Sequence, residues 1–141
     1  YLRARTMDMG QQILNPIDVA GWQEDQDWIS TGTLPMRWEF GDYLLNRYYA
    51  GNKDQFRSLL KFMIGDNEDN PETIVRTVKE YMFCNYQILE DELNDAISIF
   101  KGDIPDNYFD GGGWSIEDST VPKQFYDLLR FFVTLPEFQL K

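Results

Sequence analysis

The spacing of apolar residues is the strongest constraint on the fold of this 141-residue chain. Apolar side chains recur every three to four residues along most of the sequence, which is the period of an α-helix with a buried face. The alternating runs that are typical of half-buried strands do not occur in it. We therefore predict an all-α fold, an irregular bundle of about six helices. The predicted helices cover residues 2–14, 54–64, 71–83, 87–100 and 122–135, with one more beginning near Leu34.

Residues with known capping preferences mark several of these helix ends. Asn70 followed by Pro71 is a strong start signal, and Gly65 and Gly102 stand where helix C-caps belong. Thr33 is predicted to cap the helix near Leu34. The predicted inward positions of the other helices include Leu59, Tyr81 and Leu89.

The helix that begins near Leu34 has apolar residues on two sides, so we expect it to be central. One side carries Leu34, Trp38, Leu45, Tyr48 and Tyr49, and the other carries Met36, Phe40 and Tyr43. At the opposite end of the chain, Pro136 is predicted to stop the last helix.

Composition excludes several classes of function. The chain holds 13 basic and 24 acidic residues, a net charge of −11. This charge disfavours binding to nucleic acid and to anionic lipid. The absence of His removes imidazole catalysis and the usual zinc sites, and the single Cys84 allows no internal disulfide. No stretch is apolar enough for a membrane span, and we predict no cofactor.

A tryptophan-containing loop, residues 15–32, is the first candidate binding site. Trp22 and Trp28 flank a polar run, so the indoles could stack a sugar ring while neighbouring oxygens bind its hydroxyls. The alternative, which we favour, is that both indoles pack the loop onto the helices. In that case Gly21 provides the tight turn before the first indole. The candidate ligand-binding residues are Trp22, Trp28, Glu24, Asp25 and Asp27.

A second irregular region covers residues 102–121 and is rich in Gly and Asp. Its oxygen-bearing side chains could hold a hard cation such as Ca²⁺. Their spacing does not match an EF-hand, and a solvated, turn-rich loop is the favoured interpretation. The candidate metal ligands are Asp103, Asp106, Asn107 and Asp110.

Arg37 lies among apolar neighbours four residues after Thr33. It could pair with an acidic residue of the tryptophan-containing loop and so lock that loop to the helix. We therefore interpret Arg37 as structural, together with Gly21, Trp22 and Trp28.

Two stretches of the chain form a recognisable pattern. The first stretch consists of Met9-Gly10-Gln11, Pro16, Val19-Ala20-Gly21-Trp22, Trp28-Ile29-Ser30, Thr33-Leu34 and Arg37. The second is the end of the last helix, Leu135-Pro136-Glu137-Phe138-Gln139. Together they resemble the signature of the bacterial domain-of-unknown-function family number 1800.

The resemblance implies a cellular location and a longer parent protein, but it implies no activity. Members of this family are several times longer and resemble exported bacterial proteins, often encoded near sulfatase-like proteins, and this chain resembles their C-terminal portion. It implies a periplasmic or extracellular location and supplies no catalytic residues. The first predicted helix has no cap at its start, and we expect residues 1–141 to be a single helical domain, a fragment of a longer protein.

Three hypotheses follow for function. The favoured one is a structural or interaction module with no catalysis of its own, whose partner is the upstream part of the same parent protein or another protein. The second is a carbohydrate- or calcium-binding module built on the two loops. The third is the C-terminal part of an enzyme whose catalytic groups lie upstream.

Overall fold

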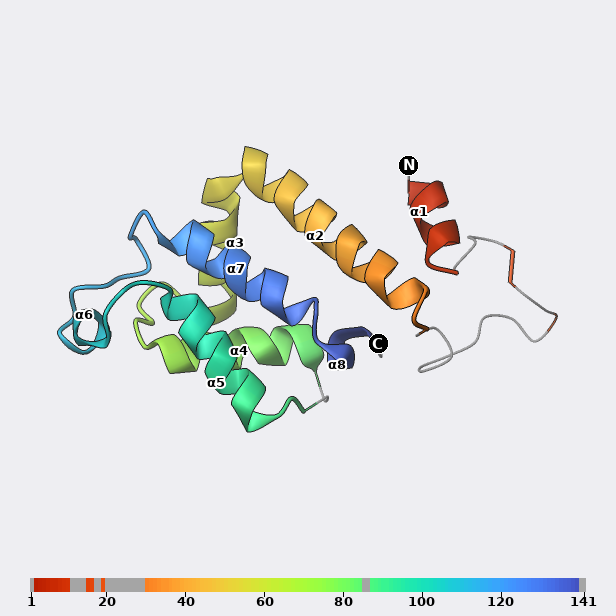
Figure 1. Ribbon diagram of the computed structural model, residues 1–141. Helices are drawn as coiled ribbons and strands as arrows, with labels where there is room; N and C mark the ends of the chain where they lie inside the picture. The colour runs from red at the N-terminus through yellow and green to blue at the C-terminus, as the bar shows by residue number, and fades with distance from the viewer. Residues whose placement is uncertain (1, 11–14, 17–18, 20–29, 85–86, 140–141) are drawn as a thin grey trace.

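A computed structural model describes residues 2–10, 15, 16, 19, 30–84 and 87–139 (Figure 1). Every regular element among these residues is a helix, which confirms the all-α prediction. Six of the eight helices correspond to the predicted ones, and two short helices, α6 and α8, were not predicted. The helices are α1 Leu2–Asp8, α2 Thr33–Gly51, α3 Lys53–Ile64, α4 Pro71–Phe83, α5 Glu90–Lys101, α6 Asp106–Asp110, α7 Val121–Phe132 and α8 Pro136–Gln139.

Helix α7 forms the centre of the core. It packs against α2, α3, α4 and α5, and Figure 1 shows it running between the α2–α3 pair and the α4–α5 pair. Most residues of α7 are buried, and even the polar Gln124 is among them. A helix that other helices surround is apolar on nearly all of its sides, which is the case for α7. None of the helices in the described residues is long and apolar enough to cross a membrane. The buried residues of α7 are Val121, Pro122, Gln124, Phe125, Tyr126, Leu128, Leu129 and Phe132.

Several helix ends lie where the sequence predicts them. The Asn70 side chain accepts hydrogen bonds from the backbone N–H groups of Glu72 and Thr73, at 2.9 and 3.2 Å, and Pro71 opens α4. Gly102 follows α5 with φ of 58°, a left-handed conformation that side chains disfavour. These caps confirm the predicted ends.

Two other helix ends differ from the prediction. Thr33 is the first residue of α2 and not its cap, since Gly32 stands at the N-cap position. Ser30 and Thr33 form a reciprocal pair at this end, in which each donates its backbone N–H to the other's hydroxyl, at 3.0 and 3.1 Å. At the far end, α7 stops at Phe132, and Pro136 opens the short helix α8 instead of ending a longer one. Proline suits a first helical turn because its missing N–H has no intrahelical partner there.

The expectation that α2 is central is wrong. None of its residues is buried, and it packs on α7 along one side only. Tyr126 Oη donates to Asn46 at 2.6 Å, and Tyr126 stacks on Tyr49 with ring centroids 4.5 Å apart. The apolar residues of the opposite side therefore remain half-buried or exposed. Leu59, Tyr81 and Leu89, which we expected to point inward, are exposed as well.

The irregular region 102–121 is anchored by Trp114, whose side chain is almost fully buried. Its indole N–H donates to Gln124 at 3.2 Å, and Gln124 in turn donates to the carbonyl of Phe100 at 2.9 Å. A buried polar network therefore holds this region against both α5 and α7. The region also contains α6, so it is less irregular than the sequence predicts.

Candidate functional site

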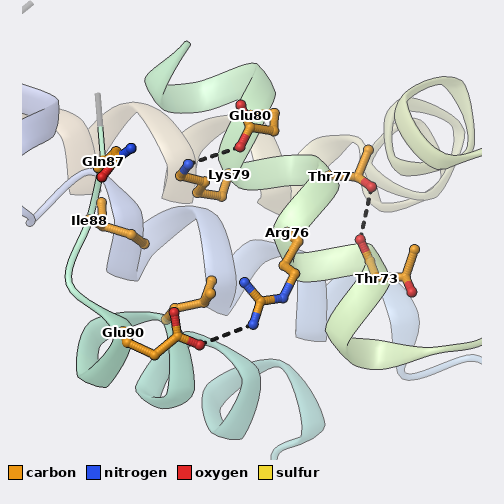
Figure 2. A pocket seen from close by; sticks show the side chains of 9 residues that line it. Thr73, Arg76, Thr77, Lys79, Glu80, Gln87, Ile88 and Glu90 are labelled. Atoms are coloured by element: carbon orange, nitrogen blue, oxygen red, sulfur yellow. Dashed lines mark hydrogen bonds and ion pairs between the residues drawn. The ribbon is translucent and has the colours of Figure 1, made fainter. Parts of the chain in front are cut away.

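A groove of about 450 Å³ lies between α4 and the start of α5 (Figure 2). Its apolar floor includes Ile88 and Leu93, while Thr73 and Thr77 bring hydroxyl groups from α4. We call it the α4–α5 groove. Exposed apolar side chains stand beside it on both helices: Tyr81 is one turn beyond Thr77, and Leu89 adjoins Ile88.

Ion pairs organise the walls of the α4–α5 groove. Arg76 reaches from α4 toward α5 and donates to Glu72 and Glu90, each at 3.0 Å (Figure 2). The hydrogen bonds that Arg76 donates, first to Glu72 and then to Glu90, raise the pKa of Arg76 above its usual value. Lys79 pairs with Glu80 at 2.9 Å. Each basic group of the groove is thus matched by carboxylates of its own chain.

The rim of the groove on the α5 side is acidic. Glu90, Asp91 and Glu92 fill the first turn of α5, where the helix dipole favours negative charge. The Glu92 carboxylate also accepts the backbone N–H of Leu89 at 3.0 Å, which fixes the start of the helix. Of these carboxylates, Glu90 belongs to the lining of the groove.

A second candidate surface lies on the outer side of α2 and α3. A hydrogen bond from Tyr48 to Gln55 joins the two helices there. Leu44 is one turn from Tyr48 on α2, and Leu59 is one turn from Gln55 on α3, so each of these two pairs shares a side of its own helix. Phe62 follows one turn after Leu59 and is 78% exposed, an unusual state for a phenylalanine. We define Leu44, Tyr48, Leu59 and Phe62 as the hairpin face.

Basic side chains stand close to the hairpin face. Arg47 donates to the Tyr43 hydroxyl at 2.9 Å, and Lys53 lies over the ring of Tyr49, with its nitrogen 5.5 Å from the ring centroid. Both positive charges are therefore held by aromatic side chains, and in the described part of the chain neither forms an ion pair. The same two helices also carry the exposed carboxylates of Glu39 and Asp54.

The candidate ligand residues of the tryptophan-containing loop lie outside the described residues. These are Gly21, Trp22, Glu24, Asp25, Asp27 and Trp28. Glycan binding by this loop and the pairing of Arg37 with it therefore stay predictions. Arg37 itself is described: it lies half-buried on α2, and burial lowers its pKa below the usual value.

The structure distributes the four candidate metal ligands around α6. Asp103 precedes the helix, whereas Asp106, Asn107 and Asp110 belong to it. Lys101 donates to Asp106 at 2.9 Å and provides that carboxylate with a positive partner. Across the described residues, no group of three or more acidic or Cys side chains is arranged to hold a metal ion. Cation binding by this loop stays a prediction.

A smaller hollow of about 390 Å³ lies beside α6 and includes Asp103, Tyr108 and Asp118. Ion pairs fix the nearby chain, since Lys61 and Arg57 both reach Glu117 from α3. The hydrogen bond from Lys61 is the main cause that holds the pKa of Glu117 below its usual value. These ion pairs hold the segment around Glu117 against α3, but they do not bring the candidate metal ligands of residues 102–121 together.

Sequence reasoning missed both surfaces that the structure brings out. Leu59, Tyr81 and Leu89 fit the inward stripes of their helices, so the period alone could not show that they are exposed. One signal was available: Phe62 falls outside the predicted inward stripe of its helix. An apolar residue on a polar face indicates a contact that the domain itself does not supply.

Fold and site together define an acidic, all-helical domain with an exposed apolar hairpin face and a separate groove. The chain belongs to the DUF1800 family, because the family model described as "Protein of unknown function (DUF1800)" matches residues 1–140. The family resemblance of the signature stretches is thereby confirmed. No curated protein and no solved structure matches the chain.

Proposed function

We propose that this domain is a helical interaction module that docks another protein surface through its hairpin face and has no catalysis of its own. One observation carries the proposal: four large apolar side chains, two on α2 and two on α3, are between 41% and 78% exposed. Patches of this kind on a domain surface usually mark contact sites. Nearby Arg47 and Lys53 favour a partner that combines apolar and acidic groups.

We further propose that the module is the C-terminal part of a longer exported bacterial protein, periplasmic or extracellular. This part of the proposal rests on the family resemblance. The partner is then either the upstream part of the same parent protein or a second protein. Fractionation of a bacterium that makes the full-length parent tests the location, and recovery with the cytoplasmic fraction would overturn it.

Site-specific photo-crosslinking tests the docking surface. Benzoylphenylalanine replaces Phe62 in the full-length parent, which keeps an aromatic ring at that position. Tyr108 on α6 is 46% exposed and receives the same label as the matched control. We expect an adduct from position 62 that maps to one defined peptide, and we expect at least a tenfold loss when Leu59→Glu places a charge in the face.

The outcome distinguishes docking from chance contact. A mapped adduct that depends on Leu59 supports the module. Equal, scattered adducts from positions 62 and 108, or an adduct that Leu59→Glu leaves unchanged, would overturn it. Circular dichroism of the Leu59→Glu variant confirms that the helices persist, which the exposure of Leu59 leads us to expect.

A further inference from the structure

The smaller hollow beside α6 combines an apolar wall with two carboxylates, and we call it the Tyr108 hollow. Ile104, Pro105 and Tyr108 supply the wall, while Asp103 and Asp118 bring the carboxylates from two separate stretches of the chain. Its volume of about 390 Å³ falls within the range of about 300–1,000 Å³ that is usual for small-ligand sites. The hollow can therefore accommodate a small organic group.

The ring of Tyr108 is held in place although it is 46% exposed. The Tyr108 carbonyl accepts the backbone N–H groups of Gly113 and Trp114, at 2.9 and 3.2 Å. Gly113 lies directly against the ring, since a Cβ there would be only 2.8 Å from Tyr108 Cε2. Trp114 is almost fully buried, which anchors this stretch in the core. The ring is thus positioned before any ligand arrives, and this reduces the entropy that binding costs.

The two carboxylates of the Tyr108 hollow form no ion pair with any described residue. The Asp118 carboxylate accepts the backbone N–H of Ser115 at 3.2 Å. Arg57 donates to the Asp118 carbonyl at 2.9 Å and not to its carboxylate. The Asp103 side chain is exposed, and no basic side chain of the described chain lines the hollow. The hollow therefore offers negative charge without a paired positive group.

This combination of groups selects an organic cation. The face of a tyrosine ring attracts a positive charge within about 6 Å of its centre, and carboxylates attract the same charge. An anion would be repelled, and a hard metal ion would need about six or more oxygen ligands. Among the described residues, no three or more acidic or Cys side chains are arranged to hold a metal. The apolar wall suits the hydrocarbon chain of an amine.

We propose that the Tyr108 hollow binds an alkylammonium group. The positive charge of this group lies against the Tyr108 ring with Asp103 and Asp118 as counter-ions, and its methylene groups contact Ile104 and Pro105. A free amine and a lysine side chain of another protein both carry such a group. The net charge of −11 draws either of them toward the chain.

A chemical-shift titration of the whole, isotope-labelled chain by NMR tests this inference. The probes are butylammonium chloride, its neutral counterpart 1-butanol, and a short peptide with one central lysine. We expect butylammonium to shift the amide signals of Tyr108 and Ser119, both in the lining, and to bind at least about tenfold more tightly than 1-butanol. Tighter binding of the peptide than of butylammonium identifies a protein lysine as the source, whereas equal or weaker binding identifies a free amine.

Variants separate the hollow from the general negative charge of the chain. Tyr108→Leu removes the aromatic face but keeps an apolar side chain, and Asp103→Asn removes one counter-ion. Each change should weaken butylammonium binding about threefold, whereas Tyr108→Phe should bind like the unchanged chain. Asp110→Asn is the matched control, because Asp110 is exposed on α6 but lies outside the lining of the hollow. Thermal melting of each variant verifies folding.

Three results would overturn the inference. The first is binding of 1-butanol or glucose as tightly as butylammonium. The second is displacement of butylammonium by calcium chloride more effectively than by sodium chloride at the same ionic strength. The third is an Asp110→Asn variant weakened as much as Asp103→Asn. The hairpin face lies on α2 and α3, away from the residues that line this hollow, so these results leave the docking proposal standing.

Discussion

At the scale of single residues, Gln124 holds the irregular region 102–121 to the core. Its side chain accepts from Trp114 at 3.2 Å and donates to the Phe100 carbonyl at 2.9 Å, all in a buried setting. Gln124→Leu keeps the volume but leaves a buried donor and a buried acceptor without partners. We expect a loss of about 2–4 kcal/mol in the free energy of unfolding, measured by urea denaturation.

Lys123→Gln is the control for this prediction, because Lys123 adjoins Gln124 in sequence but its side chain is exposed. We expect that change to alter the free energy of unfolding by less than about 0.5 kcal/mol. A Gln124→Leu variant as stable as the unchanged chain would show that the network contributes nothing to stability.

At the scale of elements, the sequence predicts where most helices lie along the chain, but it does not predict which side of each helix is buried or how two helices meet. The start of α4 was predictable because Asn70 and Pro71 act on their own backbone, within three residues. The position of α2 at the edge of the bundle was not predictable, because its two apolar sides look equivalent in the sequence. Only the packing of Tyr49 and Asn46 against α7 shows which side is inward. The groove likewise depends on how α4 and α5 meet, which no local pattern determines.

The tryptophan-containing loop leads to a prediction about the α2 element. Gly10 precedes this loop and Ser30 lies near its end, and both are close to Thr33 at the start of α2: a Cβ on Gly10 would be 3.5 Å from Thr33 Cγ2. We expect Trp22 and Trp28 to pack against this end of α2, near Trp38. Replacing either indole by Ala would then cost on the order of 3–5 kcal/mol. Differential scanning calorimetry should show a sharp fall in melting temperature.

Asp25→Ala is the comparison, and it should barely change the melting temperature. A different result would favour the carbohydrate hypothesis: a Trp variant that melts like the unchanged chain but no longer binds a glycan in an array would identify the loop as a binding site. Arg37 lies near the same end of α2 and is half-buried there.

At the scale of the whole molecule, negative charge is concentrated in residues 65–139, which we call the acidic part. Sixteen acidic and five basic residues among the described residues 65–139 repel one another on balance, and salt screens such repulsion beyond about 10 Å at 0.1 M. We therefore expect the melting temperature of the dilute, monomeric chain to rise by a few degrees between about 0.02 and 0.5 M NaCl. The exposed ion pairs oppose this effect only weakly, because each contributes little.

Neutralising carboxylates in the acidic part and in residues 1–64 should have different effects on the melting temperature. Asp95 and Asp110 are exposed in the acidic part, and neither forms an ion pair in the described part of the chain. The double change Asp95→Asn, Asp110→Asn should raise the low-salt melting temperature and reduce its dependence on salt. Glu39→Gln with Asp54→Asn removes the same charge from residues 1–64, which hold seven basic and eight acidic residues and are therefore nearly neutral. This double change should give no such gain, since Asp54 lies in the first turn of α3, where the helix dipole favours it. A melting temperature that falls with salt, or equal gains from the two double variants, would contradict an acidic part that opposes folding.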